Sequence, residues 1–137
     1  MYGLPKAERL CSRKQIAGLM EEGSVLFHFP FKIFFALQPA VAGEPCCRMT
    51  VSVPKRNFKR AVKRNLLKRR IREAFRLNKM IFYTTLQQKN KQAAVFFHYV
   101  SPEILPYDHI EPNMQKAFAK LASMLQDSVD VPAASVG

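Results

Sequence analysis

Residues 54–76 read PKRNFKRAVKRNLLKRRIREAFR and hold 11 of the chain's 22 Lys and Arg against a single acid, Glu73. Half of the basic charge therefore lies in about a sixth of the 137 residues. Apolar residues interrupt the charges, so the segment is able to form a helix that packs against a core. A packed helix with one cationic face offers fixed geometry to a polyanion, and nucleic acid fits this charge density best.

The composition is that of a folded and strongly basic protein. The chain carries a formal net charge of +12, and 48% of its residues are apolar. This length predicts a single domain, which we expect over residues 1–127, followed by a disordered tail over residues 128–137. The charge favours an anionic partner, which leaves nucleic acid, an anionic membrane surface or an acidic protein.

The sequence shows no signal for export or for crossing a membrane. It contains no run of about 18 apolar residues, and its first residues lack the basic and apolar regions of a secretory signal. The cysteines are Cys11, Cys46 and Cys47, an odd number without a CxxC pair. A disulfide framework or a zinc site is therefore not expected, and we predict a cytoplasmic protein.

The N-terminal part of the chain has the pattern of a short amphipathic helix. Ser12 begins a capping-box motif, and Ile16, Leu19 and Met20 follow at helical spacing. Gly23 is suited to the position just after the helix.

Three main strands are predicted from alternating or continuous apolar runs, and the pattern leaves open whether a fourth, shorter one precedes them. The shorter strand would lie near residues 25–29, with an aromatic strand over 31–37 and an alternating one over 48–53. Residues 93–100 are apolar almost throughout, so we expect this strand to be central. The turn-rich connection between 31–37 and 48–53 predicts that these two strands pair antiparallel.

Two longer helices complete the predicted order. The basic helix is expected to begin between Asn57 and Arg60, with Asn57 as its N-cap. The last helix is expected to have Pro112 in its first turn. Its apolar positions recur at i, i+3, i+4, i+7, i+8 and i+11, namely Met114, Ala117, Phe118, Leu121, Ala122 and Leu125.

On a helical wheel the basic helix has two faces. One line, at i, i+4, i+7 and i+11, carries Asn65, Arg69, Arg72 and Arg76, with Lys68 beside it. The opposite side carries Leu67, Ile71, Ala74 and Phe75. A guanidinium can bond two phosphate oxygens and stack on bases, so Arg along this line suits a nucleic acid. Arg64 lies near the apolar side, and we expect its stem to be buried while its head reaches out.

A basic face is often no more than a solvated surface, but this one is arranged differently. A solubilising helix usually mixes both signs of charge to gain pairs at i,i+4, whereas here only Glu73 lies among the cations. Such repulsion costs stability unless an anion compensates it. Elsewhere His28, His98 and His109 are scattered without ligand spacing, so we expect structural or surface histidines and no metal site.

The basic segment resembles a known family. The run AVKRNLLKRRIREAFR at 61–76 resembles the signature helix of the bacterial ribonuclease P protein subunit. The residues VSVPKR at 51–56 resemble that family's strand and basic turn, and Arg9-Leu10 before a helix resembles its N-terminal region. The resemblance extends over about residues 9–126. Leu66 departs from it, because a basic residue often stands there.

The resemblance implies a subunit of ribonuclease P, the ribonucleoprotein endonuclease that removes the 5′ leader from precursor tRNA. Cleavage belongs to the RNA subunit and its Mg²⁺, so the protein is expected to have no catalytic residue, no metal site and no cofactor of its own. The implied partners are ribonuclease P RNA and precursor tRNA, without a membrane or an obligate protein partner.

The resemblance also implies a fold. It is α+β, a two-layer sandwich of order α-β-β-β-α-β-α with a mixed four-stranded sheet, like domain 2 of ribosomal protein S5. The crossover through the basic helix is left-handed in that fold. Residues 1–127 would then be a single RNA-binding domain.

Site residues follow from the resemblance position by position. The expected contacts to the catalytic RNA are Arg60, Lys63, Arg64, Asn65, Lys68, Arg69, Arg72 and Arg76. The leader is expected in a cleft between the first helix and the sheet, lined by Ile16, Met20, Phe35, Ser52, Lys55 and Arg56. Ile16 and Met20 stand where the family commonly has Phe, so stacking on the leader would come from a strand aromatic such as Phe35.

Three other functions remain as alternatives. A non-catalytic DNA- or RNA-binding architectural protein would use the same helix, but the sequence lacks a helix-turn-helix pair. An enzyme acting alone on nucleic acid would need a cluster of carboxylates or histidines. A membrane-surface module would need large exposed apolar residues opposite the charges, whereas this pattern supplies core residues.

Overall fold

The computed structural model describes residues 13–136, with side-chain environments from residue 14 to residue 125. Ser12, the predicted cap of the first helix, lies outside this range. The elements in chain order are α1 (Arg13–Glu22), β1 (Ser24–His28), β2 (Phe31–Pro39), β3 (Cys47–Ser52), α2 (Ala61–Gln88), β4 (Lys91–Tyr99) and α3 (Tyr107–Val136). The α-β-β-β-α-β-α order predicted from the sequence is confirmed.

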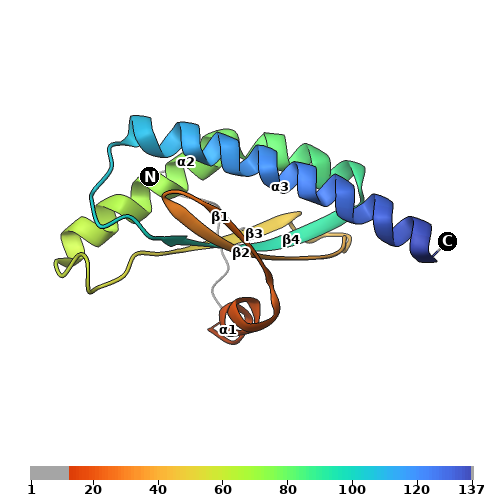
Figure 1. Ribbon diagram of the computed structural model, residues 1–137, viewed down its shortest axis with the longest axis horizontal. Coiled ribbons are helices and arrows are strands. Elements are labelled where there is room, and N and C mark those ends of the chain that lie inside the picture. The colour runs from red at the N-terminus through yellow and green to blue at the C-terminus, as the bar shows by residue number, and fades with distance from the viewer. Residues whose placement is uncertain (1–12, 137) are drawn as a thin grey trace.

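A four-stranded mixed sheet separates the helices into two groups. The strand order is β1-β2-β4-β3, and α2 and α3 lie side by side on one face (Figure 1). The single short helix α1 lies on the other face, against β2 and β4 (Figure 1). The α1 side of the sheet is therefore only partly covered, which leaves strand side chains there accessible.

The predicted antiparallel pairing of the second and third strands is wrong. β4 lies between β2 and β3, pairing antiparallel with β2 and parallel with β3. The parallel pair needs a crossover connection, and α2 supplies it. β4 is buried on both faces, as a central strand should be, and this confirms the central position predicted for residues 93–100.

The main core lies between the sheet and the pair α2–α3. Phe75 is fully buried at its centre, with its ring edge-on to Phe97 at 5.9 Å, to Phe118 at 5.4 Å and to Tyr83 at 6.3 Å between centroids. Edge-to-face packing of this kind adds to the free energy gained from burial. The core therefore fixes the rotation of α2, and with it the direction in which the basic residues point.

The start of α2 differs from the prediction. Arg60 occupies the N-cap position, with an extended backbone and no side-chain hydrogen bond, so Asn57 does not cap the helix. The reason is Phe58, which is buried in the core with its ring 6.0 Å from that of Tyr99. The N–H of Phe58 donates to the carbonyl of Pro54, so the chain makes a turn here before the helix begins.

The last helix begins one turn earlier than predicted. The N–H groups of His109 and Ile110 donate to the carbonyl of Pro106, and the helix starts at Tyr107. Ile110 is fully buried and extends the apolar stripe towards the N-terminus, so Pro112 lies beyond the first turn. The helical backbone runs on to Val136, where the sequence predicts an irregular tail. The division at residue 127 stays a prediction.

Candidate nucleic-acid interface

The two predicted faces of α2 are confirmed by burial. Leu67, Ile71, Ala74 and Phe75 are all fully buried. On the opposite side Asn65 and Arg69 are exposed, and Lys68 and Arg72 are half-buried. Because the core holds the apolar side in place, the polar side has a fixed direction relative to the sheet.

The eight residues predicted to contact the catalytic RNA do not form one surface. Arg60 and Lys63 are exposed at the start of α2. Lys63 lies away from the Asn65 line, since it borders a hollow with Pro102, Glu103 and Ile104 of the loop before α3. The central part of the predicted RNA-binding surface therefore consists of Asn65, Lys68, Arg69 and Arg72.

Arg64 is positioned differently from the prediction. Its guanidinium does not simply reach out, because Nη1 donates to the carbonyls of Phe58 at 2.7 Å and Lys59 at 3.0 Å. These acceptors are neutral, so the charge of Arg64 is retained while its head is held against the turn before α2. The side chain thus fixes the turn to the helix and also adds to the positive potential there.

Arg76 is compensated within the chain. Its Nε and Nη2 donate to the two carboxylate oxygens of Glu73 at 2.9 and 2.7 Å. The same bond lowers the pKa of Glu73, with a further contribution from the charge of Arg76. The net positive charge along the predicted line is therefore much smaller beyond Arg72, although Arg76 stays on the same side of the helix.

Arg70, which lies outside the predicted interface, has a structural role. Its Nη1 donates to the carbonyl of Leu105 at 2.7 Å, which ties α2 to the loop between β4 and α3. Asn78 makes a second tie, since its amide donates to the carboxylate of Glu111 on α3 at 3.0 Å. Both contacts hold the basic helix in its place above the sheet.

The residues predicted to line the leader cleft lie on the α1 face of the sheet, with one exception. The prediction for Phe35 is wrong. Phe35 is 6% exposed and packs in the core on the α2–α3 face. Phe34, one residue earlier, points to the α1 face and packs with Leu19 and Phe96. The rings of Phe34 and Phe96 are stacked at 5.7 Å between centroids. Successive strand residues point to opposite faces, so only one of the two can line the cleft.

The other predicted cleft residues lie around this aromatic pair. Ile16 of α1 is half-buried against it, while Met20 is 50% exposed. Ser52 is half-buried at the end of β3, and Lys55 and Arg56 are exposed in the turn that follows. The structure thus places an apolar platform beside a basic turn.

Two polar residues on this face were missed by the sequence prediction. Lys32 of β2 pairs directly with His98 of β4, which in turn pairs with Ser52 of β3. The alternation of β2 contains a signal for this, because its even positions include Lys32 and Gln38 while the odd ones are apolar. The sequence around His98 contains no such signal, because no ligand partner is near it along the chain.

His98 is held in an environment that disfavours its charged form. Burial lowers the pKa of the imidazole, and the positive charges of Lys32 and Arg56 lower it further. Its ring lies 6.2 Å from that of Phe96. The ammonium of Lys32 lies 5.4 Å from the ring of Phe34, within the range of a cation–π contact.

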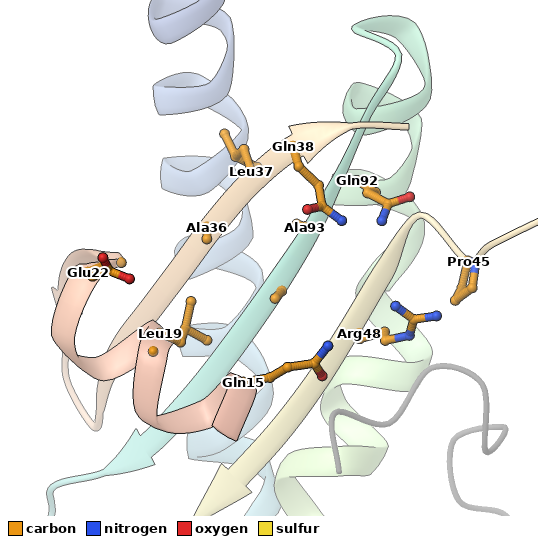
Figure 2. A pocket seen from close by; sticks show the side chains of 13 residues that line it. Gln15, Leu19, Glu22, Ala36, Leu37, Gln38, Pro45, Arg48, Gln92 and Ala93 are labelled. Carbon is orange, nitrogen blue, oxygen red and sulfur yellow. The ribbon is translucent and has the colours of Figure 1, made fainter. Parts of the chain in front are cut away.

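A pocket of about 280 Å³ lies at the other end of the same face. Figure 2 shows Gln15 and Leu19 of α1 opposite Ala36 and Gln38 of β2, with Arg48 of β3 at one side. Ala36 lies four residues beyond Lys32, about 13 Å along the strand. The pocket is thus separate from the row that contains His98.

Neither a metal cluster nor a membrane span occurs in the part of the chain that the structure describes. Its residues include no group of three or more His, Cys, Asp or Glu placed to hold a metal ion. Its helices include none long and apolar enough to cross a membrane.

Comparison with known proteins identifies the family. The family model of ribonuclease P matches residues 4–122. The chain belongs to the ribonuclease P protein family. The ribonuclease P protein component of Porphyromonas gingivalis is 37% identical over 129 residues, which cover 93% of this chain and 92% of the relative. The corresponding protein of a second strain of that species is 36% identical over 127 residues, with the same coverage.

Solved ribonuclease P proteins share the fold. The protein from Thermotoga maritima superposes with a TM-score of 0.64 at 22% identity, covering 82% of this chain and 96% of the other. One from Staphylococcus aureus gives a TM-score of 0.63 at 20% identity, covering 85% and 96%. These likenesses show the fold. The family match and the Porphyromonas gingivalis relatives make the chain a protein component of ribonuclease P, the holoenzyme that cleaves 5′ leaders from precursor tRNA.

Proposed function

We propose that this ribonuclease P protein binds the catalytic RNA through α2 and the 5′ leader of precursor tRNA across the α1 face of the sheet. The observation that supports it most directly is the cationic side of α2, which lies opposite a fully buried stripe. Asn65, Lys68, Arg69 and Arg72 would contact the RNA, with Arg60 and Lys63 at the edge. Arg64 and Arg76 would act mainly through their charge, because each already has a partner within the chain.

The charge distribution suits a folded RNA. RNA–protein binding releases counterions from phosphates, so each cation that neutralises a phosphate strengthens binding at low salt. The amide of Asn65 can both donate and accept a hydrogen bond, which suits a base edge or a 2′-hydroxyl. A rigid helix can present these groups without first being ordered, and this lowers the entropic cost of binding.

The leader would run along the sheet beside α1. The Phe34–Phe96 pair forms the apolar floor of this face, but both rings are largely covered and offer little surface for stacking bases. Lys55 and Arg56 are exposed and offer charge for phosphates. Ile16, Met20 and Ser52 would complete the contact. Phe35 has no part in it, because it is buried on the opposite face.

Cleavage would belong to the RNA subunit and its Mg²⁺, and we assign no catalytic residue to the protein. The protein would assist by screening RNA charge and by holding the leader. The three cysteines include no CxxC pair and predict no disulfide framework, so we assign the protein to the cytoplasm.

Reconstitution tests the proposal. The full chain is mixed with its cognate ribonuclease P RNA and precursor tRNA at low Mg²⁺ and moderate salt. We expect faster leader removal than with RNA alone, because the protein supplies charge that Mg²⁺ would otherwise supply. Equal rates with and without protein would refute the proposal.

A second measurement separates the leader surface from the RNA surface. Lys55→Ala with Arg56→Ala should reduce the preference for a long-leader precursor over one with a single-nucleotide leader. The matched control is Lys116→Ala with Lys120→Ala, which removes the same charge from exposed positions on α3. An equal loss in both variants would mean that only net charge matters.

A further inference from the structure

The row Lys32–His98–Ser52 crosses three neighbouring strands on the α1 face of the sheet. Lys32 and His98 are partners in the β2–β4 register, and His98 and Ser52 are partners in the β4–β3 register. Neighbouring strands lie about 4.8 Å apart, so the three side chains are adjacent on this face. Arg56, in the turn after β3, is near enough for its charge to act on His98.

This row has positive charge and one hydroxyl group, that of Ser52, but no acid. β2, β3, β4 and residues 53–60 contain neither Asp nor Glu. On α1, Glu22 lines the pocket at the other end of this face. In the described part of the chain the charges that act on His98 are those of Lys32 and Arg56, and both are cations. Like charges brought together in this way repel one another, and an anion between them would relieve the repulsion.

We propose that Lys32, Ser52, Arg56 and His98 form a phosphodiester-binding subsite, and that His98 takes up a proton when a phosphate occupies it. The inference rests on the proposed binding of the leader to this face, and it adds a residue and a chemical step to it. The ammonium and the guanidinium would neutralise the phosphate, and the hydroxyl of Ser52 would donate to one of its oxygens.

Proton uptake follows from the electrostatics of the row. Without a ligand, burial and then the charges of Lys32 and Arg56 lower the pKa of His98, which favours the neutral imidazole. A phosphate adds a negative charge beside the ring and offsets the two cations, so the pKa of His98 rises. The imidazolium then has two N–H donors, and it can give one to a phosphate oxygen. The proton comes from solvent, and no bond in the leader changes.

The consequence is a leader affinity that depends on pH. Binding that takes up a proton strengthens as pH falls, with a slope of at most one decade per pH unit. A rise of one unit in the pKa of His98 on binding gives about tenfold stronger leader binding at low pH than at high pH. Phosphodiesters do not titrate in this range, so the dependence would come from the protein.

An internal competition isolates this effect. The reconstituted holoenzyme receives a long-leader precursor and a single-nucleotide-leader precursor in one reaction, between about pH 5.5 and about pH 8. The ratio of their kcat/KM values cancels the pH dependence of the cleavage step, which both share. We expect the ratio to rise about tenfold as pH falls, to be flat in His98→Asn, and to be unchanged in the control His109→Asn on the exposed part of α3.

The outcomes separate this inference from the function on which it rests. If the long leader gives no advantage at any pH, the proposed leader binding fails, and the inference fails with it. If the long leader raises kcat/KM by the same factor at every pH, only the proposed role of His98 is overturned. The same holds if the pH dependence of that factor persists in His98→Asn.

A direct titration covers the case in which His98→Asn does not fold. Proton NMR of the native full chain follows the ring protons of His98 with and without a single-stranded oligoribonucleotide. The pKa of His98 must be higher in the presence of the oligoribonucleotide. An equal or lower value would overturn the inference whatever the variants do.

Discussion

Replacing Lys68 and Arg69 with alanine tests whether the polar side of α2 contacts RNA phosphates. Arg69 is exposed and Lys68 half-buried, and in the described part of the chain neither forms an ion pair with an acid. Alanine is the best helix former, so α2 should remain intact. If each cation contacts one phosphate, the slope of log affinity against log salt should become shallower by about 1.4 to 1.8.

The loss at a fixed salt concentration can also be estimated. At about 1 kcal/mol for each contact, the pair contributes about 2 kcal/mol, or roughly 30-fold in affinity. Filter binding or fluorescence anisotropy with ribonuclease P RNA, repeated over a series of salt concentrations, gives both numbers. Lys116→Ala with Lys120→Ala serves as the control of equal charge. A slope that stays the same in the Lys68/Arg69 variant, or changes equally in the control, would refute the assignment of this surface.

Four further predictions concern the fold. Phe75→Ala should lower the free energy of unfolding by about 3 to 5 kcal/mol in denaturant titration, because the ring is fully buried among three others; a loss below about 1 kcal/mol would contradict this packing. Gly18→Ala should raise stability by about 0.5 to 1 kcal/mol, since its new Cβ meets no atom within 4 Å. By contrast, Gly23→Ala should lower stability, because the added Cβ would lie 2.5 Å from the carbonyl oxygen of Leu19. Equal melting temperatures for Gly18→Ala and Gly23→Ala would contradict this expected contrast. Burial, and then the charge of Glu111, raises the pKa of Tyr107 to about 12. The stability that the neutral phenol contributes is therefore complete below pH 10 and is lost as pH rises towards 12. The alkaline loss of stability should be smaller in Tyr107→Phe, and identical pH profiles for the two proteins would contradict this assignment.

The helical faces were predictable because their signal is local. The stripe from Leu67 to Phe75 repeats at helical spacing, and its burial followed directly from that period. The pair between Glu73 and Arg76 also has a local signal, since residues three apart on a helix are neighbours. A helical wheel does not show that Glu73 compensates the charge of Arg76, because it gives the positions of side chains and not the hydrogen bonds between them.

The sheet was harder to predict because strand partners are set by distant parts of the chain. Nothing within residues 31–53 shows that β4 will separate β2 from β3. The choice between Phe34 and Phe35 had a signal in the polar even positions of β2, which Lys32 and Gln38 occupy. Two adjacent phenylalanines obscured it, because each is apolar enough for the core.

The strand order also sets the sequence of events while the chain is being synthesised. Among the strands that the structure describes, β1 and β2 alone can pair with each other before residue 91 has been made, because the neighbour of β3 in this sheet is β4. The basic helix is therefore complete before the strand that closes the core beneath it emerges from the ribosome. Non-local pairing of this kind slows folding, and a chain that stops short of β4 would leave its most cationic segment without a folded support.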